Sequence, residues 1–430
     1  MINLIATIIK KILPKSLLAF IKKMIFTIKL IMLPKIHQKA IDRIRNKDKI
    51  KVAFFLINVD TWKLDTLYWM FNNEDRFDAV IVLCPFVSKG IEFLKIELNK
   101  GKIYCENKKY NYLVAYDEIN SVGIDVKKII NPDIIFFTNP NALTFSKLCI
   151  SNYFNYLTCY IPYSFRIDTL YEYEFDNDLV NLTWINFYET SIHEKLAKKY
   201  ARNNAYNVFV SGYPFMDNYK SKKSNELVWK PQSRRKKRII WAPHWTIKGY
   251  QNTGLDWSCF LNYHEFILRI AEEYESKIQV AMKPHPFLKN TLSQPCLWGV
   301  NKTEKYFKKW QLLSNCQIVD GEYVNLFLES DAMIHDSGSF MVEYLALNKP
   351  VAYTLSQKNL NNRFNEFGNN VLAGHYLINS ENELKEFIMN VIEEIDPLSS
   401  GRKNIIKQHN LNKDNLISET IIKHINGKLI

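Results

Sequence analysis

The sequence predicts an α/β protein with two Rossmann-like domains, each built on a parallel sheet that helices cover on both faces. Two observations support this prediction. From residue 51 onward, short runs that are apolar throughout alternate with helical patterns, and wholly apolar strands are typical of parallel sheets buried on both sides. The 430 residues are also enough for two domains with separate cores, and a hydrophobic content of 47% is that of a globular protein.

A polar and basic stretch at 219–238 divides these elements into two sets and is typical of an interdomain linker. The first set has expected strands at 51–58, 79–84, 134–138, 158–162 and 207–211, with an amphipathic stretch at 61–73. The second set has expected strands at 239–243, 278–283, 317–320, 332–335 and 351–354, and helices at 260–274, 305–313, 323–328 and 341–347. The expected parts are a basic amphipathic segment (1–48), an N-terminal Rossmann-like domain on the acceptor side (49–220), the linker (221–238), a C-terminal Rossmann-like nucleotide-donor domain (239–400) and a helical tail (401–430).

The net charge of +13 is concentrated in two short segments. Residues 1–41 hold eight lysines and no acidic side chain, and residues 234–238 are five consecutive basic residues. Because these two segments account for the whole excess, the rest of the chain is neutral overall. A diffuse basic surface for nucleic acid is therefore disfavoured, and we expect no nucleic-acid partner.

The N-terminal segment is apolar, but its lysines interrupt every long run, so none approaches the ~20 residues that span a bilayer. No cleaved signal is predicted either. Lys15, Lys22 and Lys29 recur every seven residues on one helical face, apart from a largely aliphatic face. We predict a cationic amphipathic helix between Pro14 and Pro34 that lies on an anionic membrane surface, at the cytoplasmic face of the cell membrane. The alternative is a helix that packs on the body of the protein.

Several kinds of cofactor chemistry find no support in the sequence. Seven scattered cysteines without a CxxC pair are typical of buried thiols in a reducing cytoplasm. No GxGxxG follows the first strand and no GxxxxGK[ST] occurs, so neither dinucleotide-dependent redox chemistry nor P-loop chemistry is predicted. Since no His/Asp cluster has metal-ligand spacing, we expect neither an obligatory metal site nor a cofactor.

The strand at 278–283 runs into the motif Lys283-Pro284-His285-Pro286. The prolines stiffen this loop and direct Lys283 and His285 from the carboxyl end of the strand toward the cleft where ligands of such sheets bind. A histidine held there can donate to a diphosphate or act as an acid on a leaving phosphate, and the lysine adds a positive charge. The alternative is a structural loop.

A second motif, HDSGS at 335–339, joins an apolar strand to a helix. Small hydroxyl residues and glycine at such a turn leave backbone N–H groups available at a helix N-terminus, which is a phosphate site. Glu343 follows one helical turn later, where its carboxylate can accept hydrogen bonds from two ribose hydroxyls. An ordinary helix cap and a solvated charge are the alternatives. The candidate diphosphate ligands of this motif are Asp336, Ser337, Gly338 and Ser339.

Two further segments follow strands. Residues 241–246 (WAPHWT) end the first strand of the second domain and place His244 near the same cleft, and residues 212–217 (GYPFMD) close the last strand of the first domain. A simple turn explains either segment equally well.

In this order, the four segments resemble those of the CDP-glycerol glycerophosphotransferase family of teichoic-acid and capsular polysaccharide synthesis. Residues 212–217 are similar to the family's GxPRxD segment, with Phe215 where Arg is usual. Residues 242–246 are similar to its aPTwR segment, with His244 in place of Thr and Thr246 in place of Arg.

His285-Pro286 corresponds to the family's xHP segment, and residues 335–339 with the later Lys349-Pro350 are similar to its SDYSS turn and the following helix that ends in KP. The resemblance implies a GT-B-like fold and peripheral association with the membrane. It also implies that His285 and residues 337–339 contact the diphosphate of CDP-glycerol, with the cytidine in the second domain.

The first half departs from the family. Its members carry a WHGTPLK segment whose histidine acts as the catalytic base, whereas the equivalent residues 160–165 here (YIPYSF) contain no histidine. Either another group activates the acceptor hydroxyl, with His244 favoured over Asp168 and His193, or the donor and the reaction differ from those of the family.

The leading hypothesis is a transferase that moves glycerol phosphate, or a related polyol phosphate, from a CDP-activated donor to a hydroxyl of a lipid-linked surface polysaccharide. Its candidate catalytic residues are His285 and His244. One alternative is a GT-B glycosyltransferase that uses a nucleotide sugar in capsule or lipopolysaccharide synthesis. Another is a non-catalytic membrane scaffold of a polysaccharide assembly complex.

Overall fold

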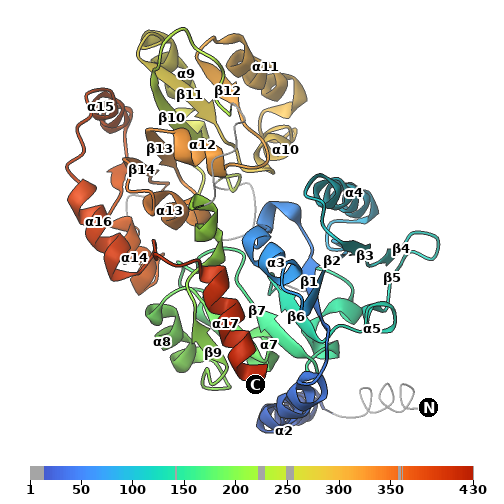
Figure 1. Ribbon diagram of the computed structural model, residues 1–430. Coiled ribbons are helices and arrows are strands. Elements are labelled where there is room, and N and C mark those ends of the chain that lie inside the picture. The colour runs from blue at the N-terminus through green and yellow to red at the C-terminus, as the bar shows by residue number, and fades with distance from the viewer. Residues whose placement is uncertain are drawn as a thin grey trace. The chain divides into compact units, whose positions relative to one another are not determined.

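The structure, a computed structural model, describes residues 14–140, 143–220, 228–247, 256–356, 360 and 362–429 (Figure 1). The chain forms two compact units. The first unit takes its described residues from Met1–Tyr163, Leu170–Ser211 and Ser418–Ile430, and the second comprises those of Ser164–Thr169 and Gly212–Ile417. Each unit is built on its own parallel sheet, as the alternation of apolar strands and helices predicts.

The sheet of the first unit has seven parallel strands in the order β3-β2-β1-β6-β7-β8-β9. These are β1 (Ile50–Leu56), β2 (Phe77–Leu83), β3 (Tyr112–Val114), β6 (Ile134–Phe137), β7 (Leu157–Tyr160), β8 (Ile185–Tyr188) and β9 (Val208–Val210). The order reverses at β1, which pairs with β2 on one side and β6 on the other. At its core, the rings of Phe54 and Phe136 stack at 4.8 Å across the β1–β6 pair.

Short helices and one antiparallel ribbon complete the first unit. The helices are α3 (Asp65–Asn72), α4 (Ile91–Asn107), α5 (Val126–Ile129), α6 (Tyr171–Phe175), α7 (Asp178–Leu182), α8 (Ser191–Tyr200) and α17 (Ile417–Leu429), with 3-10 turns η1 (Val59–Thr61), η2 (Ser146–Leu148) and η3 (Ile150–Asn152). The ribbon consists of β4 (Tyr116–Asp117) and β5 (Val122–Gly123). Every strand predicted for this unit is present, whereas β3, β8 and the two short strands of the ribbon were not predicted.

Helix α2 (Lys15–Ile44) begins after Pro14 as predicted, but the prediction that Pro34 ends it is wrong, since Pro34 lies inside the helix. Proline in a helix costs one backbone hydrogen bond. Here the turns around and beyond Pro34 pack against α7 and β7, and this burial compensates for the lost bond (Figure 1). The buried side chains of this half are Leu33, His37, Ala40, Ile41 and Ile44.

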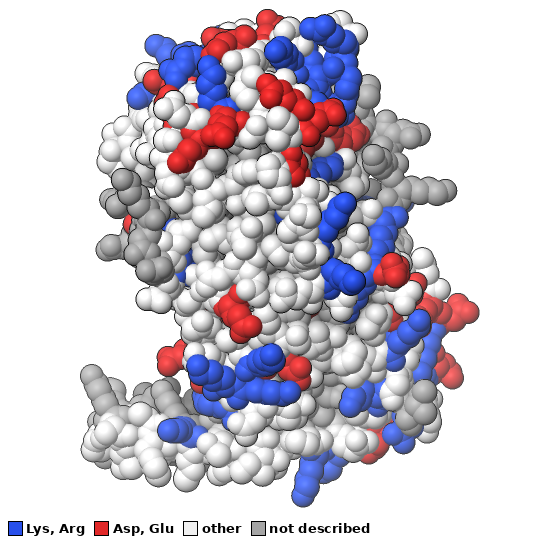
Figure 2. All heavy atoms as spheres, turned by 90° about the vertical axis from the view of Figure 1, so that its left-hand side faces the viewer, with Lys and Arg blue, Asp and Glu red and all other residues white. Residues whose placement is uncertain are grey.

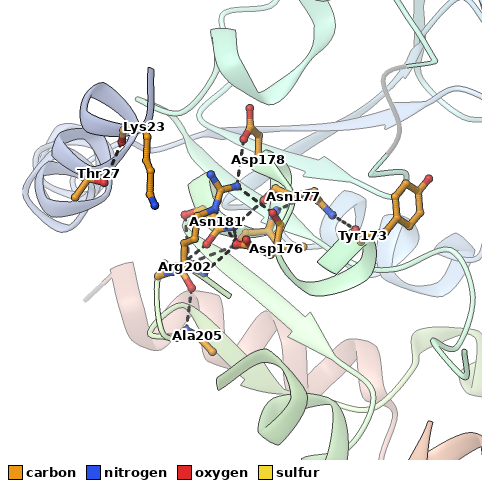
Figure 3. A network of polar contacts seen from close by, with 11 residues as sticks. Lys23, Thr27, Tyr173, Asp176, Asn177, Asp178, Asn181, Arg202 and Ala205 are labelled. Atoms are coloured by element: carbon orange, nitrogen blue, oxygen red, sulfur yellow. Dashed lines mark hydrogen bonds and ion pairs between the residues drawn. The ribbon is translucent and has the colours of Figure 1, made fainter. Parts of the chain in front are cut away.

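The N-terminal half of α2 instead presents apolar side chains to solvent. It contacts the rest of the first unit at Phe26, whose ring lies 4.1 Å from the Arg202 guanidinium. Arg202 in turn pairs with Asp176 at 2.9 Å, and Figure 3 shows Lys23 and Thr27 of α2 beside this polar network. Among the described residues, no helix is both long and apolar enough to cross a membrane. The large apolar side chains that this half exposes are Leu17, Phe20, Met24, Ile25, Ile28, Ile31 and Met32.

The sheet of the second unit has six parallel strands in the order β12-β11-β10-β13-β14-β15. These are β10 (Lys237–Ala242), β11 (Ile278–Met282), β12 (Cys316–Ile318), β13 (Ala332–His335), β14 (Val351–Thr354) and β15 (Tyr376–Ile378). The first five match the predicted strands, and β15 was missed. The order reverses at β10, which pairs with β11 and β13, just as the first sheet reverses at β1.

The connecting helices of the second unit follow the predicted pattern and extend it toward the C-terminus. They are α9 (Phe260–Glu273), α10 (Leu288–Leu292), α11 (Gly299–Leu312), α12 (Val324–Glu329), α13 (Gly338–Leu345), α14 (Glu366–Leu372), α15 (Glu381–Ile392) and α16 (Ser399–Gln408), with the 3-10 helix η4 (Pro214–Tyr219). All four helices predicted for this part of the chain are present.

The division into units differs from the expected boundaries in two places. Residues 164–169 belong to the second unit because Asn365 binds the carbonyl oxygens of both Arg166 and Ile167 at 2.8 Å. The C-terminal tail is not one piece, since α16 lies in the second unit whereas nearly all of α17 lies in the first. In α17, the His424 ring stacks on Phe209 of β9 at 3.7 Å.

Part of the expected linker (221–238) belongs to the second unit. Residues 221–227 lie outside the described residues, but the chain from residue 228 onward packs into the second unit, where Trp229 is buried. The basic run continues into β10, which begins at Lys237. It therefore lies at the amino end of this strand, opposite the carboxyl end that carries the predicted site.

Candidate active site

The candidate site lies where the strand order of the second sheet reverses. Because β10 and β13 are neighbours whose chains continue toward opposite edges, their carboxyl ends mark the position at which α/β sheets typically bind ligands. The structure brings three predicted motifs to this edge: residues 242–246 after β10, 283–286 after β11 and 335–339 at the end of β13.

Asp336 joins two of these segments. One carboxylate oxygen accepts the backbone N–H of His244 at 2.5 Å, and the other accepts that of Cys259, just before α9, at 2.6 Å. Burial raises the pKa of the Asp336 carboxyl to about 7, against the opposing effect of these two N–H donors. Both oxygens are thus occupied by the protein, and the side chain is buried. Asp336 positions the loop that carries His244 instead of presenting its carboxylate to a diphosphate.

The ring of His244 is fixed by Thr246. The Nδ1 atom lies 2.8 Å from the Thr246 hydroxyl, which itself accepts the N–H of Trp257 at 3.1 Å and so has its proton available for Nδ1. Burial, assisted by the charge of Arg363, lowers the pKa of His244 to about 3. A neutral ring that accepts at Nδ1 carries its proton on Nε2. His244 is therefore a hydrogen-bond donor at Nε2, which does not suit the role of general base.

His285 is held in the same way. Its Nδ1 accepts the N–H of Phe287 at 3.1 Å, and its own backbone N–H donates to the Pro243 carbonyl at 3.0 Å. The centroids of the His285 and His244 rings are 4.9 Å apart. Both side chains are half-buried. The two imidazoles consequently form a pair of adjacent N–H donors at the carboxyl ends of β10 and β11, an arrangement suited to phosphate oxygens.

The turn of the HDSGS motif begins helix α13. Ser337 is the N-cap residue, yet its hydroxyl makes no capping hydrogen bond, and Ser337, Gly338 and Ser339 are half-buried. A Cβ at Gly338 would lie 3.3 Å from the Ile167 side chain, so residues 164–169 leave little room for a larger residue at position 338. The first N–H groups of α13 have no partner within the helix and can bind an anion.

Lys283 and Glu343 are both buried, and both contact Tyr323. Lys283 is 6% exposed, and its Nζ lies 5.8 Å from the centre of the Tyr323 ring. Glu343 is fully buried and accepts the Tyr323 hydroxyl at 2.6 Å, while Tyr219 donates to the Glu343 carbonyl at 2.8 Å. Tyr323 therefore links the two side chains that the sequence assigned to diphosphate and ribose.

Of the two other candidate bases, His193 lies in the first unit, whereas Asp168 belongs to residues 164–169, which border Gly338. His193 is fully buried in the first unit, where Nδ1 lies 2.8 Å from the Thr190 hydroxyl. The backbone of Asp168 forms an isolated antiparallel β-bridge with that of Phe364. Asp217 of the GYPFMD segment is buried and accepts the N–H of Ile417 at 2.7 Å, which is a structural contact. Among the described residues, no three His, Cys, Asp or Glu side chains are grouped to hold a metal ion.

Sequence reasoning missed Arg363 and Trp257, which border the site. The Arg363 guanidinium lies 4.0 Å from the centre of the Trp257 ring and donates to Ser356 at 3.1 Å. Its charge contributes to the low pKa of His244. Neither residue belongs to a recognisable motif, since Arg363 follows β14 in an irregular stretch, so no local pattern marks it.

The profile described as CDP-Glycerol:Poly(glycerophosphate) glycerophosphotransferase matches residues 176–425, more than half of the chain and nearly all of the second unit. The chain belongs to this glycerophosphotransferase family. The predicted resemblance is confirmed, and the chain is a member of a family of transferases. No curated protein sequence matches the chain.

Solved structures show the fold of this glycerophosphotransferase family member. The UDP-GlcNAc 2-epimerase from Neisseria meningitidis, bound to UDP-GlcNAc, is 13% identical with a TM-score of 0.58, over 88% of this chain and 99% of that one. The S. aureus MnaA-UDP structure is 16% identical with a TM-score of 0.56, over 89% and 97%. At such identities the likeness concerns the fold alone, and it confirms the predicted GT-B-like class with two Rossmann-like sheets.

Proposed function

We propose that this family member transfers glycerol phosphate, or a related polyol phosphate, from a CDP-activated donor to a hydroxyl of a lipid-linked surface polysaccharide. The observation that supports the proposal best is the pair of N–H donors on His244 and His285 beside the N-terminus of α13. The acceptor oxygen attacks the β-phosphorus, a new phosphodiester bond forms, the bond to CMP breaks, and the acceptor hydroxyl releases its proton. Such chemistry depends mainly on positioning and on neutralising phosphate charge.

Each group in the site has a proposed part in this reaction. His285 and His244 donate from Nε2 to diphosphate oxygens as negative charge moves onto the departing CMP. The hydroxyls and backbone N–H groups of Ser337, Gly338 and Ser339 hold the same diphosphate at the helix N-terminus. Lys283 contributes positive charge, and Glu343 binds the ribose once the side chains that cover its buried carboxylate move aside. Asp336 acts indirectly, because it fixes the position of His244.

The membrane is the proposed location of the acceptor. The N-terminal half of α2 exposes apolar side chains, among them Phe20 at 63% and Ile31 at 72%, alongside Lys23 and Lys35. An apolar face flanked by lysines suits the interface of an anionic membrane. We therefore propose peripheral attachment at the cytoplasmic face, with the catalytic units beside the lipid-linked acceptor.

A panel of nucleotide donors tests the function. The purified protein is incubated with CDP-glycerol, CDP-ribitol and nucleotide sugars, together with a membrane fraction as acceptor, and release of CMP, UDP or UMP is measured. CMP release that depends on the acceptor, and that His285→Ala abolishes, supports the proposal. Activity with nucleotide sugars alone would contradict it.

The absence of histidine from residues 160–165 favours one second candidate, a glycosyltransferase that uses a nucleotide sugar. Two imidazole donors beside a helix N-terminus suit the diphosphate of either nucleotide donor. The same panel decides between them, since glycosyl transfer releases a nucleoside diphosphate whereas glycerophosphate transfer releases CMP. A scaffold without activity would release neither.

A further inference from the structure

A basic cavity lies at the end of the second sheet opposite the candidate active site. It has a volume of about 560 Å³ and is open to solvent. It lies at the amino ends of β10 and β11, where the Lys237 N–H donates to the Lys277 carbonyl at 2.9 Å. Figure 2 shows charged side chains, many of them Lys and Arg, gathered at one end of the second unit. The charged side chains that line the cavity are Arg234, Arg235, Lys236, Lys237, Lys277 and Asp331.

The charges of this cavity are only partly balanced. Arg235 pairs with Asp331 at 2.8 Å, and Lys237 pairs with Glu394. Arg234 donates to a backbone carbonyl, which leaves its positive charge uncompensated. Lys236 and Lys277 form no ion pair with any carboxylate of the described residues. Three cations thus share one concave surface, and such a focused positive field attracts anions.

The position of the cavity excludes a part in the reaction itself. Strand β10 begins at Lys237 of the basic run and ends at Ala242, two residues before His244. At about 3.3 Å per residue, the two ends of the strand are about 16 Å apart. No group in the cavity can reach a diphosphate bound beside His244. A single ligand that reaches both places must therefore be a long chain, and the three cations of the cavity favour one that carries negative charges along its length.

We infer that this cavity binds the acceptor as a phosphodiester polymer, holding phosphates that lie several units away from the reacting end. This inference rests on the proposed function, because repeated transfer of glycerol phosphate makes such a polymer. The cavity then raises the affinity for long acceptors without changing the chemical step. Binding by Lys and Arg at separate phosphates releases counterions, so the affinity for long chains falls steeply as salt increases.

The test compares two variants that each remove three positive charges from the second unit. The cavity variant carries Arg234→Gln, Lys236→Gln and Lys277→Gln. The matched control carries Lys305→Gln, Lys308→Gln and Lys309→Gln on the exposed face of α11. Affinity for a fluorescent poly(glycerol phosphate) chain of about twenty units and for a single glycerol phosphate unit is measured without donor, at several salt concentrations.

We expect the cavity variant to bind the long chain at least tenfold more weakly, with a shallower salt dependence, while the control binds as the wild type does. With CDP-glycerol as donor, the cavity variant should show a raised KM for long acceptors and unchanged CMP release with short ones. An unchanged affinity for the long chain, or an equal loss in the control, would overturn the inference. Loss of binding to phosphatidylglycerol vesicles with unchanged binding of the polymer would also overturn it, because the cavity would then be a lipid site.

The binding measurement keeps this inference separate from the proposed function. If CDP-glycerol gives no CMP with any acceptor, the proposed function fails. If the long chain nevertheless binds and the cavity variant loses that binding, the polymer site stands on its own.

Discussion

Asp336 and His244 are joined by a hydrogen bond of 2.5 Å from the backbone N–H of His244 to the Asp336 carboxylate, across the point where the strand order of the second sheet reverses. The other carboxylate oxygen holds Cys259 at 2.6 Å. One side chain at the end of β13 thus fixes both ends of the segment between β10 and α9. The position of the His244 ring, and with it the paired donors of the site, depends on this carboxyl group.

We predict that Asp336→Asn weakens both the fold and the reaction. An amide offers one acceptor oxygen, so one of the two backbone N–H groups loses its partner, at a cost of about 1–3 kcal/mol in the free energy of unfolding. CMP release should fall because His244 is displaced. Chemical denaturation and the donor assay measure the two effects. Wild-type stability in the variant would show that this carboxylate does not hold the loop.

The pH dependence of stability gives an independent check on Asp336. An unfolded aspartic acid loses its proton near pH 4, whereas burial keeps that of Asp336 in place up to about pH 7. The folded state therefore binds more protons between these values, and the contribution of Asp336 to stability is largest below pH 4 and is lost as the pH rises to 7. The difference in unfolding free energy between wild type and Asp336→Asn should shrink over this range. A difference that grows with pH would contradict the raised pKa.

His285 should be needed for catalysis as a hydrogen-bond donor. His285→Ala removes the donor and is expected to lower kcat by about 100-fold or more. His285→Gln, whose amide can still donate, should retain part of the activity if His285 donates a hydrogen bond without transferring its proton. His264→Ala on α9 removes another imidazole from the same unit and serves as the control. Full activity in His285→Ala would remove this residue from the mechanism.

Tyr323 and Glu343 allow the structural and ligand-binding roles of a buried carboxylate to be separated. Tyr323→Phe and Glu343→Gln both disrupt the bond of 2.6 Å between them, so each should lower the free energy of unfolding by about 1–3 kcal/mol. Their effects should be less than additive in the double variant. If Glu343 also binds the ribose, Glu343→Gln alone raises the KM for the donor. Equal KM values in the two single variants would count against the ribose assignment.

Much of the fold follows from the sequence because wholly apolar strands leave a strong local signal. All ten predicted strands are present, and two of the strands that were missed, β15 and β8, have local reasons. In β15, Tyr376 and Leu377 remain partly or largely exposed. In β8, the polar Asn186 interrupts the apolar run, and only the structure shows that its side chain is satisfied by Thr183 and the Val180 carbonyl. The end of α2 was misjudged because Pro34 is a local signal, whereas the packing of Ile41 and Ile44 is a tertiary one.

The candidate site was predictable as a set of residues but not as an arrangement. Prolines, glycine and small hydroxyl residues at strand ends marked His285, His244 and the turn at 337–339. The sequence contains no information on which carboxylate oxygens the backbone already occupies, so Asp336 was expected to contact the ligand. Arg363 escaped notice because its place beside Trp257 arises from contacts between segments about a hundred residues apart.

The exposed half of α2 should attach the protein to membranes. Ile25, Ile28 and Ile31 are 48%, 47% and 72% exposed, and burying such side chains in the interface stabilises the bound state by up to about 1.5–3 kcal/mol each. The triple substitution to Glu should therefore lower sedimentation with vesicles that contain phosphatidylglycerol by more than tenfold. Stability should hardly change, since these side chains are largely outside the core.

The choice of substitutions, in place of a deletion, follows from the packing of α2. Removal of residues 1–41 would also delete Leu33 and Ala40 from the core of the first unit, and any loss of membrane binding could then reflect unfolding. Val300→Glu with Leu312→Glu is the matched control, because these residues of α11 are 61% and 73% exposed. Vesicle binding that survives the α2 substitutions, or that the control lowers equally, would show that attachment does not depend on this helix.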